Sequence, residues 1–302
     1  MPSSFLFAAC VLIWGSTWLA ITFQLGEVDP GLSVAYRFTL ASILLGTFCL
    51  LRRLPMRLPL HIHVKMAAVG LSLYTLDYTL LYQAQQYIVS AVVALMSSSI
   101  IYINVVLRRV LLKKPIRLEV IVGSTLGMAG IGLIFIPEFT VFSATDGLVL
   151  GIILAMVSFL FASIGNVVSE RILDHGTPVI QMNFYAMSYG LVFMYGGALL
   201  SGTEFVLPDS QSYWLSLLYL ALFGSVLGFG AYMKLLSQIG SDKAAYVVLM
   251  YPIVALLLST LFEGYQWHWF SALGVVIVLF GNAIAMDKIP LPRARKKVAT
   301  AD

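Results

Sequence analysis

Apolar runs long enough to cross a membrane recur along this chain. A helix needs about 20 mostly apolar residues to span the hydrocarbon of a bilayer. With 60% hydrophobic and 11% charged residues, the chain lacks the polar surface that a water-soluble protein of its length would need. We therefore predict an all-α membrane protein with ten transmembrane helices. The expected spans are Ser4–Phe23, Leu32–Leu51, Val64–Tyr82, Val89–Leu107, Leu118–Ile136, Gly147–Val168, Pro178–Leu200, Tyr213–Met233, Ala244–Phe262 and Trp269–Met286.

The charges in the loops between these runs alternate in sign. Lys and Arg collect in cytoplasmic loops of membrane proteins, and 17 of the 18 basic residues here fall on one side if all ten runs cross. The basic set is Arg52, Arg53, Arg57, Lys65, Arg108, Arg109, Lys113, Lys114, Arg117, Arg171, Lys234, Lys243, Lys288, Arg293, Arg295, Lys296 and Lys297. The opposite loops hold acids such as Glu27, Asp29 and Glu204. We expect a multi-pass protein of the cell (inner) membrane with both termini cytoplasmic.

The excess of basic residues, a net charge of +4, is explained by their place in the cytoplasmic loops, so nucleic acid is not an expected partner. Cys10 and Cys49 lie inside apolar runs and do not indicate a disulfide framework. His61 and His63 have no third ligand nearby, which is poor for zinc. Nucleotide-binding loops and catalytic triads are also missing from the sequence. We therefore expect neither an enzyme nor a bound cofactor or metal.

A weak repeat divides the chain into two halves of five expected spans each. Small residues recur at a fixed offset, and a proline precedes the second span of each half. The matched pairs are Ser90 and Ser241, Gly123 and Gly274, Gly130 and Gly281, and Pro30 and Pro178. Because five is odd, the second copy would be inverted in the membrane, an arrangement typical of transporters. We expect repeats at residues 1–140 and 141–287, followed by a basic tail at 288–302.

Three stretches resemble a known family. GSDKAAYVVLMYPIVALLLSTLFEGYQWHWFSALGVVIVLFGN, Gly240–Asn282, is similar to the C-terminal repeat of the EamA family in the drug/metabolite transporter superfamily. LIWGSTWLAI at Leu12–Ile21 and YRFTLAS at Tyr36–Ser42 are similar to its first repeat. The resemblance implies a secondary transporter that exports small metabolites, such as amino acids, by alternating access. Its partners would then be a small-molecule substrate and the lipid bilayer.

Other functions stay open at this point, namely a membrane-embedded lipid-handling protein or a passive channel. Glycine pairs such as Gly123 with Gly127 and Gly224 with Gly228 are typical of close helix packing. Internal packing is the simpler interpretation of these pairs and a dimer face is the alternative, so we expect a monomer or a weak homodimer. Substrate, direction and proton coupling are not determined by the sequence.

The eighteenth basic residue, Arg37, lies inside an apolar run, about 7 Å from its outer end at ~1.5 Å per residue. It could reach the headgroups by snorkelling, or it could face a cavity and pair with Asp77, which lies at a similar depth. We favour the cavity because ionisable residues within spans usually face the bundle interior. Asp77 belongs to a polar stripe with Tyr74 and Tyr78, which could bind substrate or hold helices together.

The remaining candidates have alternative structural roles. Trp14 lies too deep for an interfacial belt, so its indole N–H needs a cavity or a packed aromatic core. Asn166 and Ser98 could instead hold helices together. Pro252 breaks a backbone hydrogen bond in mid-span and is a candidate hinge. The expected substrate-binding residues are Trp14, Thr17, Trp18, Arg37, Tyr74, Asp77, Tyr78, Ser98, Asn166, Tyr185 and Tyr251.

Overall fold

The computed structural model describes residues 1–88, 93–94, 96–139, 146–262, 267–285 and 288–290. All regular secondary structure in these ranges is helical. Five helical runs are long and apolar enough to cross a membrane: Ser3–Thr22, Pro30–Leu51, Val149–Asp174, Gln211–Ile239 and Ser241–Leu258. Leu118–Ile134 and Trp269–Ala285 are shorter apolar helices. The expected span Val89–Leu107 begins on residues outside the described ranges.

The first two helices are α1, Ser3–Thr22, and α2, Pro30–Leu51, close to the expected spans. The start of α2 is fixed by its own sequence. The Asp29 side chain accepts a hydrogen bond from the Leu32 N–H at 3.1 Å, and Pro30 occupies the first turn, where its missing N–H costs nothing.

The later helices follow in chain order. They are α3 (Leu60–Val69), η1 (Gly70–Asp77), α4 (Tyr78–Ala84), α6 (Ser99–Leu111), α7 (Leu118–Phe139), α8 (Asp146–Asp174), α9 (Val179–Leu200), α10 (Gln211–Tyr219), η2 (Leu220–Leu227), α11 (Gly228–Ile239), α12 (Ser241–Ala244), α13 (Val247–Phe262) and α14 (Trp269–Ala285).

Two of these elements, η1 and η2, are π-helical segments inside longer runs. η1 joins α3 to α4, and η2 joins α10 to α11, without interruption. Each is eight residues long, and their first residues, Gly70 and Leu220, are 150 positions apart. π-helical turns are rare and occur frequently at functional sites.

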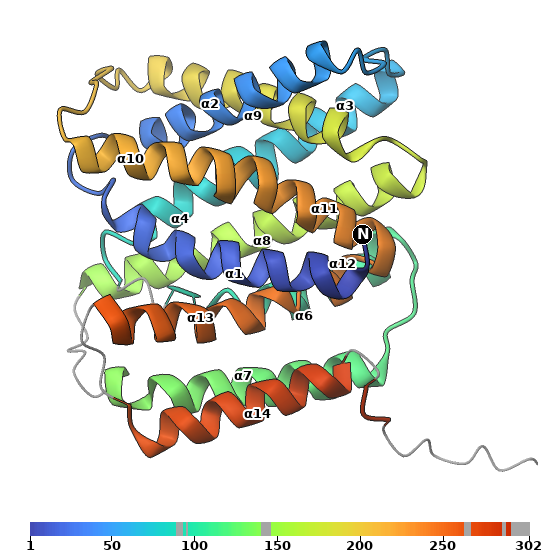
Figure 1. Cartoon of the computed structure of the whole chain (residues 1–302), viewed down its shortest axis with the longest axis vertical. Helices are drawn as coiled ribbons and strands as arrows, with labels where there is room; N and C mark the ends of the chain where they lie inside the picture. The colour runs from blue at the N-terminus through green and yellow to red at the C-terminus, as the bar shows by residue number, and fades with distance from the viewer. Residues whose placement is uncertain (89–92, 95, 140–145, 263–266, 286–287, 291–302) are drawn as a thin grey trace, which may run out of the picture.

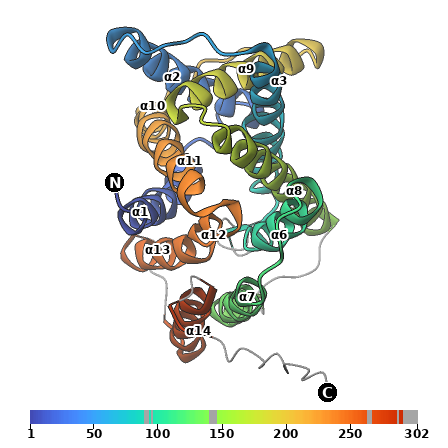
Figure 2. The ribbon, with the colours of Figure 1, turned by 90° about the vertical axis from the view of Figure 1, so that its right-hand side faces the viewer.

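The helices run roughly side by side and stack along the long axis of the molecule (Figure 1). At the top α2 packs on α9, in the middle α1 packs on α11 and α13, and α8 packs on η1, α4 and α6. η1 also packs on α9, while η2 packs on α2. At the bottom α7 and α14 form a pair set apart from the main bundle in both views (Figure 2).

The α7–α14 pair depends on glycines. A Cβ on Gly123 would lie 2.4 Å from the Gly281 carbonyl oxygen, and one on Gly130 would lie 2.7 Å from that of Gly274. The two backbones therefore approach too closely for any side chain at these positions. Gly127 lies against Leu249 of α13, so this glycine surface packs internally.

The loops at the two ends of the bundle differ in charge. Segments 52–59, 112–117 and 175–178 lie at the same end as the start of α1, on the right of Figure 1, and we call this the basic end. Segments 23–29 and 201–210 lie at the opposite end, which we call the acidic end. Lys and Arg occur in the first set of segments and are missing from the second.

Candidate functional site

A cavity lies in the middle of the bundle among α1, α2, η1, α4, α6, α8, α11 and α13. Its volume is about 90 Å³, enough for several water molecules at roughly 10–15 Å³ each. Its walls are formed by Trp14, Thr17, Trp18, Ile21, Arg37, Leu73, Asp77, Tyr78, Leu81, Ser97, Ile100, Phe159, Ala162, Asn166, Phe229, Tyr232, Val248 and Tyr251.

Arg37 of α2 points into this cavity and is 1% exposed. Its Nε donates to the Ser225 Oγ of η2 at 2.9 Å, and its Nη1 donates to the Tyr82 hydroxyl at 3.4 Å. Its guanidinium carbon lies 4.9 Å from the centre of the Tyr78 ring, a cation–π contact. Arg37 is therefore held by hydroxyls and a ring, and it does not snorkel to the surface.

Asp77 is the last residue of η1 and is 7% exposed. The Ser158 Oγ of α8 donates to its Oδ1 at 2.6 Å. A hydrogen bond from a hydroxyl stabilises a carboxylate but does not neutralise it. Asp77 thus presents a second ionisable group to the same cavity.

The ion pair between Arg37 and Asp77 that the sequence suggested is absent from the described structure. The two side chains line one cavity, but each is held by its own hydroxyl partners on different helices. Among the described residues, neither lies within ion-pair distance of an opposite charge. A buried charge without a charged partner is costly unless something else compensates it. The cavity therefore offers a guanidinium and a carboxyl group to a molecule that enters it.

Aromatic rings form much of the remaining wall. The Trp14 Nε1–H donates to the Gly224 carbonyl at 3.1 Å, and its ring lies 4.8 Å from that of Tyr232 and 5.2 Å from that of Phe229. Trp18 lies 5.7 Å from Tyr251, centre to centre. These rings suit the apolar part of an amphipathic solute.

Two further polar groups reach the wall. Asn166 of α8 is 4% exposed, and its Oδ1 has no hydrogen-bond partner among the described residues. Ser97, just before α6, is hydrogen-bonded to the Tyr251 hydroxyl. An unpaired buried amide oxygen that faces a cavity is available to a donor on a ligand.

The structure brings eight of the eleven expected substrate-binding residues to this cavity: Trp14, Thr17, Trp18, Arg37, Asp77, Tyr78, Asn166 and Tyr251. It does not bring Tyr74, Ser98 or Tyr185. The Tyr74 hydroxyl donates to Asn183 at 3.3 Å behind the wall. Ser98 is buried beside the wall residue Ser97, and its hydroxyl has no partner among the described residues. Pro252, the expected hinge, is buried in α13 beside the wall residue Tyr251.

Tyr185 lies at the basic end, away from the cavity. Its hydroxyl donates to the Met56 carbonyl at 2.7 Å, and its ring contacts His63. Tyr185 comes seven residues after Pro178, as Arg37 comes seven residues after Pro30, but α2 begins at the acidic end and α9 at the basic end. Seven residues from the start of each helix therefore place Arg37 nearer the acidic end and Tyr185 nearer the basic end.

Most of the wall residues that sequence reasoning missed are apolar or aromatic, such as Phe159, Phe229 and Tyr232. Apolar residues in a span give no signal that separates a cavity wall from packing. Tyr232 lies one residue from the end of the expected span Tyr213–Met233, where a tyrosine is typical of the interfacial belt, so none of the three carried a usable signal.

Comparison with known proteins gives a consistent result. The EamA-like transporter family model matches residues 1–136 and again 149–286. An Escherichia coli (strain K12) protein named "Uncharacterized inner membrane transporter YedA" is 30% identical over 277 residues, covering 89% of this chain and 86% of that protein. A Salmonella typhimurium protein named "Probable amino-acid metabolite efflux pump" is 22% identical, covering 92% of each chain. A solved crystal structure matches with a TM-score of 0.77 at 18% identity, over 95% of this chain and 96% of that one, which shows a shared fold.

A bundle of apolar helices around a cavity that holds a buried arginine and a buried aspartate, together with these matches, defines a membrane transporter. The chain belongs to the EamA-like transporter family, whose model covers both of its halves.

Proposed function

We propose that this protein is a secondary transporter that exports small metabolites, namely amino acids or related amphipathic solutes, across the inner membrane by alternating access. One observation carries the proposal: a single buried cavity presents the Arg37 guanidinium and the Asp77 carboxylate between aromatic walls. The name of the Salmonella typhimurium relative, which refers to amino-acid metabolite efflux, is in keeping with this substrate class.

The chemistry of the wall suits a zwitterion. A guanidinium binds a carboxylate through parallel N–H donors, so Arg37 would hold the substrate carboxylate. Asp77 would hold the ammonium group, and the free Asn166 Oδ1 would accept a further hydrogen bond. Trp14, Trp18 and their ring partners would cover the apolar side chain. Each charge of the substrate would then compensate one of the two buried ionisable groups of the wall.

We further propose that the ten expected spans form two inverted five-helix repeats, residues 1–140 and 141–287, followed by the tail 288–302. The double match of the family model supports a duplication. The equal lengths and matched positions of η1 and η2 support it too, as do the reciprocal contacts Gly123–Gly281 and Gly130–Gly274. Alternating access by rocking of inverted repeats about a central site is an established mechanism for this kind of architecture.

The alternation of basic loops supports cytoplasmic termini, because Lys and Arg are retained on the cytoplasmic side. The internal packing of Gly123 and Gly127 removes one candidate dimer surface, so we propose a monomer as the transporting unit. Transport, rather than catalysis, is the activity that the named relatives favour.

A transport screen tests the proposal. Purified protein in proteoliposomes is loaded with unlabelled solute, and uptake of the radiolabelled solute by exchange is measured for amino acids, amines and carboxylic acids. We expect saturable uptake of one or more amino acids and weaker uptake of solutes that have only one of the two charges. Uptake that does not saturate would indicate a channel, and activity on lipids alone would indicate a lipid-handling protein. Either result would overturn the proposal.

A further inference from the structure

We infer that Arg108, Glu170, Ser241 and Asp242 form a gate that closes the cavity at the basic end and breaks when the transporter opens to that side. We call these four residues the basic-end latch. The inference rests on the proposed alternating access, and it names the contact that would have to open in one half of that cycle.

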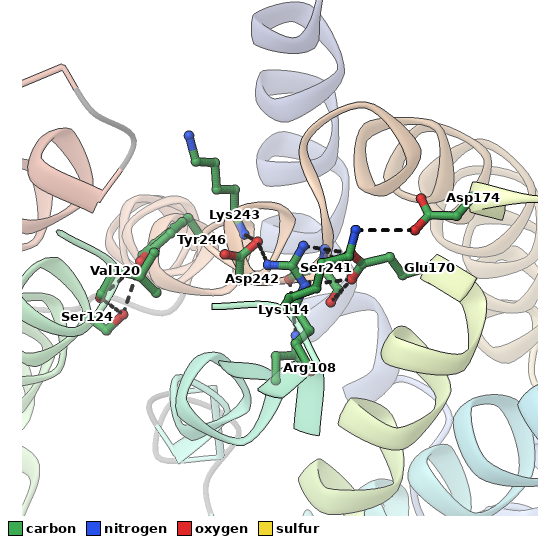
Figure 3. Close-up of polar contacts among 11 residues, drawn as sticks. Arg108, Lys114, Val120, Ser124, Glu170, Asp174, Ser241, Asp242, Lys243 and Tyr246 are labelled. Carbon is green, nitrogen blue, oxygen red and sulfur yellow. Dashed lines mark hydrogen bonds and ion pairs between the residues drawn. The ribbon is translucent and has the colours of Figure 1, made fainter. Parts of the chain in front are cut away.

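The latch joins three helices through one guanidinium (Figure 3). Arg108 of α6 donates to both carboxylate oxygens of Glu170 on α8, with Nε–Oε2 at 2.8 Å and Nη2–Oε1 at 2.6 Å. Its Nη1 lies 2.6 Å from the Asp242 Oδ1 of α12. The Ser241 N–H donates to the Glu170 Oε2 at 3.0 Å, and the Ser241 hydroxyl bonds to the same oxygen. α6, α8 and α12 are thus held together by charge-assisted hydrogen bonds.

The latch lies directly beyond the cavity on the same helix faces. On α8 the wall residues Ala162 and Asn166 are followed one turn later by Glu170. On α6 the wall residue Ile100 is followed at four-residue steps by Asn104 and then Arg108. The Asn104 side chain also donates to the Ser241 carbonyl at 3.2 Å. The latch therefore lies across the basic end of the helices that line the cavity.

The cavity comes close to the acidic end along two of its helices. On α1 its wall begins at Trp14 and reaches Ile21, one residue before the helix ends at Thr22. On the η1–α4 run it reaches Leu81, while the helix ends at Ala84. The cavity thus comes within one turn of the acidic ends of α1 and α4, and the latch lies between it and the basic end.

The latch is closely fitted as well as buried. The Arg108, Glu170 and Asp242 side chains are 13%, 3% and 7% exposed. Gly240, which has a φ of +83°, immediately precedes α12, and a Cβ there would lie 2.5 Å from the Arg108 Nη2. The chain thus turns in a conformation that favours glycine, and the guanidinium packs against the turn.

A buried ionic contact is a poor choice if stability alone is required. Apolar residues of similar volume often stabilise a protein as well or better. An ionic contact does have one property that apolar packing lacks: its groups can be rehydrated when the helices separate. Opening the cavity to the basic end requires α6 to move away from α8 and α12. Every bond that Arg108 makes in the latch crosses one of these two boundaries, while the Ser241–Glu170 bonds hold α12 on α8.

The same end of the bundle provides a matched control. Lys114 and Asp174 follow α6 and end α8, and their Nζ–Oδ2 distance is 3.7 Å. Both side chains are nearly half exposed, at 46% and 45%. An exposed ion pair of this kind contributes little to the stability of a protein. The Lys114–Asp174 pair connects the same two parts of the chain as Arg108 and Glu170, but because it is exposed it does not close the route from the cavity to the basic end.

Thiol labelling in membrane vesicles tests the inference without any substrate. A reporter cysteine is placed on the cavity wall by Ala162→Cys, in a chain whose Cys10 and Cys49 are replaced by alanine. A membrane-impermeant maleimide is then added to the face that holds the basic end, which a tag on the N-terminus identifies. We expect slow labelling with the latch intact. Arg108→Gln should speed it about tenfold or more, because it leaves the buried Glu170 and Asp242 carboxylates without their cation and shifts the population toward the open form. Asp242→Asn should also speed it, by a smaller factor, because it removes the ion pair between α6 and α12 and keeps the one between α6 and α8. Lys114→Gln should leave the rate unchanged.

Equal labelling rates in the latch variants and the parent would overturn the inference, provided that the variants elute as the parent does in size-exclusion chromatography. If Arg108→Gln does not fold, Asp242→Asn decides, because it keeps the Arg108–Glu170 contact. An equal acceleration by Lys114→Gln would also overturn it, since any loss of charge would then suffice. Faster labelling in a protein that transports no solute would support the latch and refute the proposed function.

Discussion

At the scale of single residues, the site depends on two charges that are held apart. Arg37 and Asp77 line one cavity, but serine and tyrosine hydroxyls hold each of them on a separate side. An ion pair between them would have neutralised both and left the cavity without charge for a ligand. Separate hydroxyl partners fix the positions of the two groups and leave their charges available.

Ser158 is the positioning residue for Asp77, so Ser158→Ala is expected to weaken transport of a zwitterionic substrate about tenfold. A hydrogen bond to a charged group is worth roughly 1.5–3 kcal/mol, and 1.4 kcal/mol corresponds to a factor of ten. The loss should appear mainly as a higher KM in the exchange assay. Ser163→Ala is the control, because Ser163 is equally buried on α8 but bonds to the Ile100 carbonyl. Equal losses in the two variants would show that packing of α8, and not the Asp77 contact, is responsible.

Individual site residues could be predicted only where a polar group stands out from an apolar run. Arg37, Asp77 and Asn166 are such groups, and all three line the cavity. Tyr74 was expected on the same face as Asp77 and Tyr78 because they recur at steps of three and four residues. η1 is π-helical, and its backbone hydrogen bonds join residues five apart instead of four. Each turn therefore holds more residues, and side chains at steps of three and four no longer share one face.

At the scale of helices, the two π-helical segments carry much of the site. η1 ends at Asp77, and η2 supplies the Ser225 hydroxyl to Arg37 and the Gly224 carbonyl to Trp14. No pattern in the sequence distinguishes these segments from ordinary helix, because the bonding shift depends on how the neighbours pack. The α-helical spans were more predictable: α1 and α2 begin and end within two residues of their expected bounds.

Glycines in these elements predict two different kinds of mutant. A Cβ at Gly224 would lie 2.9 Å from the Arg37 Nη2, the movable end of a long side chain, and 3.0 Å from the Thr17 Cγ2. We expect Gly224→Ala to fold but to transport at least about tenfold less, because Arg37 must leave its position. At Gly123 the obstacles include the Gly281 carbonyl oxygen and the Ala285 N of α14, which cannot give way locally. Gly123→Ala should therefore lower the melting temperature and the yield of folded protein.

Gly230→Ala is the control for both variants, because a Cβ at Gly230 meets nothing within 4 Å. Thermal unfolding in detergent and the exchange assay together separate the two effects. A Gly224→Ala protein with normal transport would show that the position of Arg37 is not critical. A Gly224→Ala protein that melts as early as Gly123→Ala would show that η2 is needed for folding and not specifically for the site.

At the scale of the whole molecule, the fold class could be predicted because lipid restricts the possible structures so strongly. Only helices and closed barrels satisfy backbone hydrogen bonds in hydrocarbon, so apolar runs of about 20 residues imply a helical bundle. The cavity could not be placed this way. Its limit at the basic end is set by the latch of Arg108, Glu170, Ser241 and Asp242, and that latch brings together residues from three distant parts of the sequence.

The central claim is that Arg37 and Asp77 bind the two charges of one zwitterionic substrate. Isothermal titration calorimetry tests it most directly, with an amino acid from the screen, its uncharged amide in place of the carboxylate, and its N-acetyl form in place of the ammonium. In the parent protein each derivative should bind about tenfold or more weakly. In Arg37→Gln the amide should bind as well as the amino acid, and in Asp77→Asn the N-acetyl form should do so, because the partner of the missing charge is gone. If each variant instead weakens the amino acid and both derivatives by the same factor, neither residue recognises the charge assigned to it, and the account is wrong.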